Sequence, residues 1–208
     1  MTTVKITSND VVHYLYKDLD HAINYMALLD NYWSTTEAEK KELINLTNFW
    51  CKKGMQTIVR SLVESLTMTL CRMSDSSPKD QTCSFIRLKD LLKEEGHDLS
   101  DSFEDLYESH SQGNALKKLF IARAHLVAHR NQSIENLSDD CQPILGDVKP
   151  VFDSTVNLML EVQRWFPHDL EINQKISDEK LFVDKAKFTL FPSLEGVQFA
   201  EFIIKSDS

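Results

Sequence analysis

The residues best suited to chemistry in this sequence are an arginine and a histidine separated by five residues, Arg123 and His129, in the segment RAHLVAHRN. A guanidinium keeps its positive charge and donates hydrogen bonds in a planar fork. An imidazole accepts and releases a proton near neutral pH. The pair therefore suits phosphate chemistry, because the arginine can hold the charge of an anion while the histidine moves a proton.

The charge around this pair favours an anionic ligand. Between residues 108 and 135 the chain has no Asp or Glu, although it carries 32 in all. The same gap contains further basic side chains: Lys117, Lys118, Arg130, His110 and His125. The formal net charge of −9 argues against a broad nucleic-acid surface, but it permits a small cationic cleft.

The helical pattern leaves two interpretations of Arg123 open. On an ideal helix, at 100° per residue, Arg123 shares an apolar stripe with Leu116, Leu119 and Phe120. It either pairs with an Asp or Glu from another helix or lies at a functional interface, and the two are about level. His129 lies about 120° around the same helix, so a site built from two copies of the chain brings both side chains together more easily.

A metal site is the weaker interpretation of the histidines. His125 and His129 are four residues apart, but the pattern lacks the glutamate of the H-E-x-x-H motif. We expect no metal and no cofactor.

The segment from Arg123 to Asn131 resembles the Arg-x(4–6)-His motif of HEPN domains, and the stretch from Ser61 to Asp75 resembles the AbiU-type abortive-infection branch of that family. The resemblance covers most of the chain up to Phe166. It implies an all-α, HEPN-like helical bundle and a metal-independent endoribonuclease of a toxin–antitoxin or phage-defence system, acting as a homodimer.

The resemblance also implies roles for individual residues. Arg123 would stabilise the charge that develops on the phosphate, and His129 would act as general base or acid while the 2′-OH of the RNA attacks. The residues expected to contact the RNA are Lys118, His125, Arg130 and Asn131. The chain departs from the family pattern at two positions, with Ala124 where active relatives have Asn, Asp or His, and Asn131 where related sequences often have Asp.

These departures keep an alternative open, a catalytically silent HEPN module that binds RNA or a partner protein such as a nucleotidyltransferase antitoxin. A helical scaffold in which Arg123 only completes an ion pair is the third interpretation.

Composition sets the broad class. The 5 Gly and 5 Pro supply little turn-rich β structure, and the 42% hydrophobic content is that of an ordinary globular domain. The four cysteines show no C-x-x-C spacing, so we expect free thiols in a reducing compartment. No apolar run approaches the roughly 20 residues of a membrane span, which predicts a cytoplasmic protein without a membrane partner.

Apolar spacing and capping residues predict the helices. The first should run from Ser8 or Asn9 to Trp33, and a long second helix from Thr36 to Met73, with Ile58 in its apolar stripe. Further helices are expected over residues 84–95, from 100 to about 112, from 114 through the motif, and over 148–166.

The chain is expected to divide into a helical bundle, residues 1–166, and a C-terminal extension, residues 167–208. Within the extension, residues 181–191 predict a helix, and residues 197–204 predict either a strand or a last helical turn.

Overall fold

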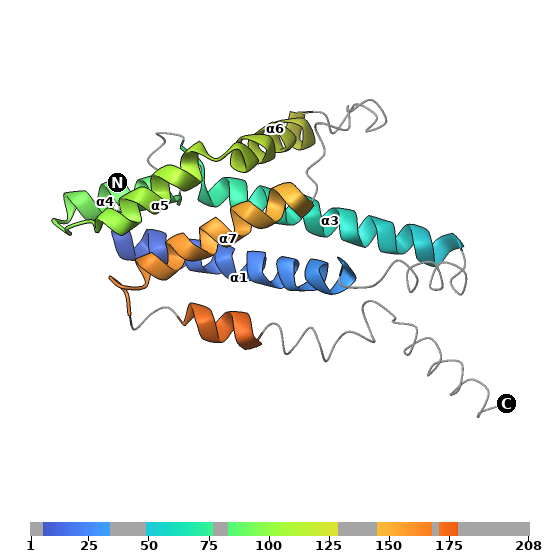
Figure 1. The fold of residues 1–208 in the computed structure, drawn as a ribbon, viewed down its shortest axis with the longest axis horizontal. Coiled ribbons are helices and arrows are strands. Elements are labelled where there is room, and N and C mark those ends of the chain that lie inside the picture. Colours follow the sequence, from blue (N-terminus) through green and yellow to red (C-terminus); the bar gives the residue numbers. More distant parts are fainter. Residues whose placement is uncertain (1–5, 34–48, 77–82, 129–144, 168–170, 179–208) are drawn as a thin grey trace, which may run out of the picture.

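The computed structural model describes residues 6–33, 49–76, 83–128, 145–167 and 171–178 (Figure 1). The labelled helices are α1 (Ser8–Trp33), α3 (Phe49–Met73), α4 (Phe85–Glu94), α5 (Asp101–Gln112), α6 (Asn114–Ala128) and α7 (Leu145–Val162). Residues 172–178 are also helical, and the described ranges contain no strand. The predicted all-α class is confirmed, while the predictions for residues 34–48, 129–144 and 179–208 lie outside the described residues.

Three helices, α1, α3 and α7, lie alongside one another and form the body of the bundle (Figure 1). The short helices α4 and α5 lie at the end of the bundle where α1 begins, and α6 packs on α3 and α7. The motif helix α6 is therefore held by two other helices of the bundle.

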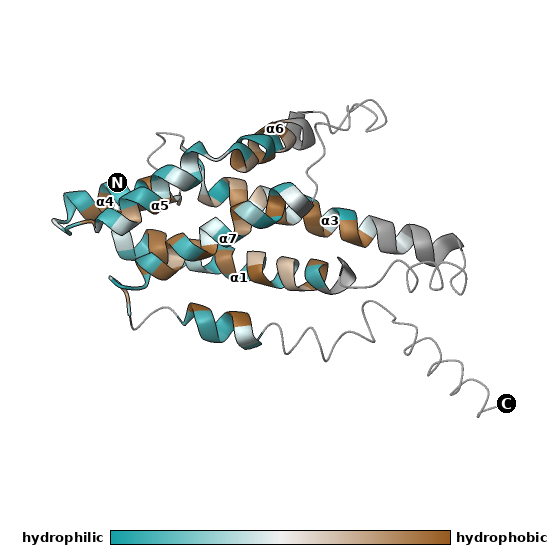
Figure 2. Ribbon diagram, in the orientation of Figure 1, coloured by the Kyte–Doolittle hydropathy of each residue, from teal (hydrophilic) through white to brown (hydrophobic). Residues whose placement is uncertain are grey.

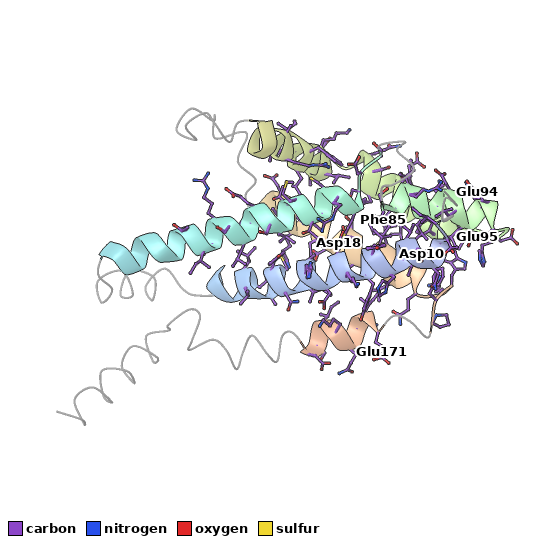
Figure 3. The ribbon with its side chains drawn as sticks, turned by 180° about the vertical axis from the view of Figure 1, so that it is seen from behind. Asp10, Asp18, Phe85, Glu94, Glu95 and Glu171 are labelled. Carbon is purple, nitrogen blue, oxygen red and sulfur yellow. The ribbon has the colours of Figure 1, made fainter. Side chains whose placement is uncertain are left out.

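The start of α1 is capped one residue earlier than the sequence predicted. The carboxylate of Asp10 accepts hydrogen bonds from the Thr7 backbone N–H (2.9 Å) and hydroxyl (2.7 Å), and these bonds lower the pKa of Asp10. Ser8 instead donates from its backbone N–H (2.9 Å) and its hydroxyl (2.5 Å) to the carboxylate of Glu95, at the end of α4. Figure 3 labels Asp10 and Glu95 in this region, where α1 meets α4.

The boundaries of α4 and α5 agree with their predicted signals. Ser84 and Glu95 flank α4, and Gly96 follows with a φ of +81°, in the region that favours glycine. At α5, the Ser100 hydroxyl accepts a hydrogen bond from the backbone N–H of Phe103.

Helix α7 begins and ends earlier than predicted. It starts at Leu145 and contains Pro150, and its last regular turn ends at Val162. Beyond Val162 the backbone hydrogen bonds change to the 3₁₀ pattern, in which an N–H donates to the carbonyl three residues earlier. The N–H of Trp165 donates to the carbonyl of Val162 at 3.0 Å. This tighter turn brings Trp165 and Phe166 against the core.

The core has two clusters that both draw on α1 and α7. One adds residues of α4 and α5, including the fully buried Phe85 and Phe103. The other adds residues of α3 and α6. Figure 2 shows hydrophobic and hydrophilic bands alternating along these helices, as expected when one face is buried.

The first cluster extends past the predicted boundary at residue 166. Ile172 is fully buried in it, and Ile176 packs against it. The division into two regions stays a prediction, but these two side chains are packed with the bundle.

One predicted core residue of α3 is wrong. Ile58 is 49% exposed, whereas Leu66, Leu70 and Met73 of the same stripe are buried. The next residue, Val59, packs against the second core cluster, so the buried face of α3 passes through Val59 and Leu62 here and leaves Ile58 outside it.

Candidate functional site

Helix α6 presents Arg123 at the edge of its buried face. Leu116, Leu119 and Ala122 are buried, and Phe120 and Arg123 are half-buried beside them. The predicted stripe is confirmed for these positions. The side chain of Arg123 is 32% exposed, so it is partly packed against the bundle and partly accessible to solvent.

Arg123 is paired with an acid from another helix end. Its Nη1 donates to Oδ2 of Asp75 at 3.3 Å, and Asp75 lies two residues beyond the end of α3. The guanidinium also lies over the ring of Phe120, with 6.0 Å from Cζ to the ring centroid. The ion pair that the sequence left as an alternative is therefore present.

The thiol of Cys71 lies near this pair and is not reactive at neutral pH. Cys71, on α3, is fully buried, and burial raises its pKa to about 12 although the charge of Arg123 opposes that rise. A thiol with such a pKa stays protonated at neutral pH, so Cys71 does not supply a nucleophile here.

A second ion pair of an arginine, between Arg72 and Asp18, is a close bidentate contact. Arg72, on α3, donates from Nε to Oδ2 of Asp18 at 2.7 Å and from Nη2 to Oδ1 at 2.5 Å, so the contact is bidentate. It joins α3 to α1 (Figure 3). By comparison the pair between Arg123 and Asp75 is a single, longer contact, which leaves the guanidinium more able to engage an additional anion.

Lys118 is also engaged by an acid. Its Nζ contacts Oδ1 of Asp147, on α7, at 2.9 Å, while 61% of the Lys118 side chain stays exposed. The segment between residues 108 and 135 is thus free of acids in sequence but not in space, because α3 and α7 bring Asp75 and Asp147 to it. Sequence spacing alone could not reveal these two partners.

The other predicted site residues are not placed. The backbone of His125 belongs to α6, but its side chain is outside the description, and His129, Arg130 and Asn131 lie outside the described residues. Ala124, the first departure from the family motif, is exposed on α6 next to Arg123. The grouping of Arg123 with His129 therefore stays a prediction.

The remaining histidine of the acid-free segment, His110, is not a surface cation. It is 4% exposed at the end of α5, and burial lowers its pKa to about 4. Its Nε2 lies 2.7 Å from the hydroxyl of Ser74, at the end of α3, and its Nδ1 lies 2.7 Å from the hydroxyl of Ser154, on α7. No local sequence pattern predicts this network, because its three members are far apart along the chain.

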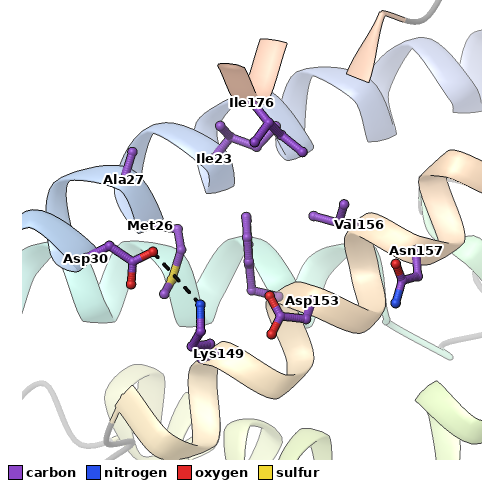
Figure 4. Close-up of a pocket in the computed structure, with 10 residues that line it drawn as sticks. Ile23, Met26, Ala27, Asp30, Lys149, Asp153, Val156, Asn157 and Ile176 are labelled. Carbon is purple, nitrogen blue, oxygen red and sulfur yellow. Dashed lines mark ion pairs between the residues drawn. The ribbon is translucent and has the colours of Figure 1, made fainter. Parts of the chain in front are cut away.

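A groove of about 320 Å³ lies elsewhere, between α1, α7 and residues 172–178 (Figure 4). Its walls include Ile23, Met26 and Ile176, and Lys149 faces Asp30 across its rim at 3.9 Å. Neither Arg123 nor Lys118, the predicted site residues whose side chains the structure describes, lines this groove.

The described ranges lack two features, a metal-binding cluster and a membrane-spanning helix. No three His, Cys, Asp or Glu side chains in them lie close enough to hold a metal ion. None of the helices described is both long and apolar enough to span a membrane.

The family model described as HEPN_AbiU2, AbiU2, matches residues 8–173, which include α1, the motif helix α6 and α7. No curated protein and no solved structure matches the chain.

Proposed function

This chain belongs to the AbiU2 family of HEPN domains, and from that premise we propose that it is a metal-independent endoribonuclease of a toxin–antitoxin or phage-defence system. Family membership itself suggests a function related to abortive infection. The observation that carries the proposal is Arg123, a motif arginine that pairs with Asp75 through one nitrogen and keeps 32% of its side chain exposed.

The proposed reaction uses the 2′-OH of the RNA as the nucleophile. His129 removes its proton or protonates the leaving oxygen, and Arg123 stabilises the charge on the phosphate. The guanidinium has five N–H donors, and the contact to Asp75 involves one nitrogen, Nη1. Asp75 can therefore orient Arg123 while other donors meet a phosphate oxygen. Lys118, His125, Arg130 and Asn131 would contact the RNA around the scissile phosphate.

Two copies of the chain are proposed to form the cleft. Besides Lys117 and Lys118, α6 exposes Ile121, which is 51% exposed, and Ala124 next to Arg123. A second α6 packed near this face would place two copies of the motif together. Sedimentation should find a homodimer at tens of micromolar, on the order at which modest interfaces associate. A monomer at that concentration would contradict the two-copy cleft.

Substitution of the motif residues tests the catalytic assignment. His129→Ala should lower RNA cleavage by roughly 10²–10⁴-fold, the usual cost of losing a positioned acid–base group. Arg123→Ala should also inactivate the protein. The matched control is Arg72→Ala, which removes a guanidinium from α3 that clamps Asp18 and should leave the cleavage rate near that of the wild type. Wild-type cleavage by His129→Ala would refute the assignment.

The exposed Ala124 offers a gain-of-function test. If the missing polar neighbour limits how the arginine and histidine are held, Ala124→Asn should raise the rate. An unchanged rate would remove that explanation for the departure from the motif.

A second candidate function is a silent module that binds RNA or a nucleotidyltransferase antitoxin. The observation in its favour is that both Arg123 and Lys118 already have acidic partners, Asp75 and Asp147. Binding of RNA by the wild type without cleavage of any RNA would favour this module over the nuclease.

A further inference from the structure

The buried ring of His110 joins four helices at one point. It comes from the end of α5, contacts Ser74 after α3 and Ser154 on α7, and packs edge-to-face on Phe85 of α4 with 5.9 Å between ring centroids. Ser74 is the residue before Asp75, the partner of Arg123. The ring is thus one residue away from the pair that holds the motif arginine.

The hydrogen atoms in this network fix its direction. Each serine hydroxyl also lies close to a carbonyl, Ser74 to that of Leu70 at 2.8 Å and Ser154 to that of Val151 at 2.9 Å. A neutral imidazole has one N–H, and each serine has one O–H. Four contacts therefore share three hydrogens, and both ring nitrogens are hydrogen-bonded only if one serine donates to the ring instead of to its carbonyl.

Ser154 is the serine that can leave its carbonyl at least cost. The Val151 carbonyl also accepts the Thr155 hydroxyl at 2.8 Å, in addition to the helical N–H expected within α7. A carbonyl oxygen has two lone pairs, so it does not need the third donor. Ser154 then donates to Nδ1, and the proton of His110 is on Nε2, where it donates to Ser74.

That bond restrains the end of α3. The Ser74 hydroxyl and backbone N–H both donate to the carbonyl of Leu70, at 2.8 and 3.1 Å, and the hydroxyl oxygen of Ser74 also accepts from the His110 ring. With Ser74 held at both sides, the carboxylate of Asp75 has a defined position under Arg123.

We propose that His110 is a positioning residue for the motif arginine, acting through its Nε2–H bond to Ser74 and the adjacent Asp75. The role rests on the proposed function where it concerns catalysis, but the restraint on Arg123 exists without RNA. Burial supports a neutral ring near neutral pH, because it lowers the pKa of His110 to about 4.

A matched pair of serine substitutions tests this role. Ser74→Ala and Ser154→Ala each delete one contact of 2.7 Å to the same ring, but only Ser74 leads to Asp75. Exchange of the Arg123 Nη–H protons with water, followed by NMR in the free protein, should become about 10-fold faster in Ser74→Ala and change little in Ser154→Ala, because Nη1 is the atom that donates to Asp75. Ser74→Thr keeps the hydroxyl, so the exchange of the Arg123 protons in this variant should be as slow as in the wild type.

The same variants should also differ in the rate at which they cleave RNA. A displaced arginine should lower kcat by about 10-fold or more in Ser74→Ala with KM nearly unchanged, since small misplacements of a catalytic group are costly. His110→Phe should match Ser74→Ala in both measurements, and the serine variants still decide the question if His110→Phe does not fold.

The outcomes distinguish this inference from the proposed function. Equal Arg123 exchange in the two alanine variants, or a His110 proton found on Nδ1 by nitrogen NMR, would overturn the positioning role even if the protein cleaves RNA. Faster exchange in Ser74→Ala alone would support the role even if no RNA is cleaved, and in that case only the nuclease proposal fails.

Discussion

Replacing His110 by phenylalanine should remove much of the loss of stability that we expect of this protein in mild acid. Burial lowers the pKa of His110 from 6.5 to about 4 in the folded protein, whereas the unfolded chain keeps the ordinary value. Between these two pH values the unfolded state binds the proton and the folded state does not. The free energy of unfolding therefore falls as the pH drops from 6.5 to about 4.

The size of the effect follows from the shift. At about 1.4 kcal/mol per pKa unit, the wild type should lose about 3 kcal/mol of stability across the whole range through this one group. Two carboxylates also contribute to the loss of stability in acid, because hydrogen bonds lower their pKa values in the folded protein. Asp10 accepts from Thr7, and Glu104 accepts from Lys93 and Lys89. Both remain in the variant, so their contribution cancels in the comparison.

Urea unfolding at several pH values, for the wild type and for His110→Phe, measures this difference. The stability gap between the two proteins should change by about 3 kcal/mol in favour of the variant as the pH falls from 6.5 to 4. His21→Phe, the same change at an exposed histidine of α1, is the control and should follow the wild type. A gap between wild type and His110→Phe that stays constant with pH would refute the buried, neutral state of His110.

Three further substitutions have defined outcomes. Gly96→Ala should lower the free energy of unfolding by about 1 kcal/mol in urea titrations, because an alanine is strained at a φ of +81° although its Cβ would meet no other atom. An unchanged free energy of unfolding would show that the left-handed conformation is not required. Phe103→Ala should cost about 3–5 kcal/mol in the same assay, because the fully buried ring packs on Trp165 and Tyr107, and a cost below about 1 kcal/mol would contradict its place in the core. Lys118→Ala should reduce the salt dependence of RNA binding by about 0.7 in the slope of log K against log salt, the value for one phosphate contact on a single strand, whereas an unchanged slope would exclude that contact.

The sequence predicted the elements whose signals are local. The start of α5 at Ser100 follows from one hydroxyl and one N–H, and the end of α4 follows from Gly96. The stripe of α1 is regular over its full length, and it is buried as expected. Such features depend on neighbours along the chain, which the sequence displays directly.

The features that were missed depend on contacts between distant residues. Ser8 caps nothing in its own helix, because the carboxylate of Glu95 reaches it from α4. Ile58 was placed in the α3 stripe but is exposed, because its neighbour Val59 is the residue that packs against the core there. His110 was counted among the basic residues, yet it is buried and hydrogen-bonded to two other helices. The sequence could suggest an acidic partner for Arg123 but not that Asp75 is that partner.

The ends of the RNA fragments test the central claim most directly. If the motif of Arg123 and His129 promotes attack by the 2′-OH, incubation of the purified protein with mixed RNA should give fragments with a 2′,3′-cyclic phosphate and a 5′-hydroxyl. Added chelator should have no effect, and DNA of the same sequence should stay intact. Fragments with a 5′-phosphate, cleavage of DNA, or cleavage that requires added divalent metal would contradict the mechanism.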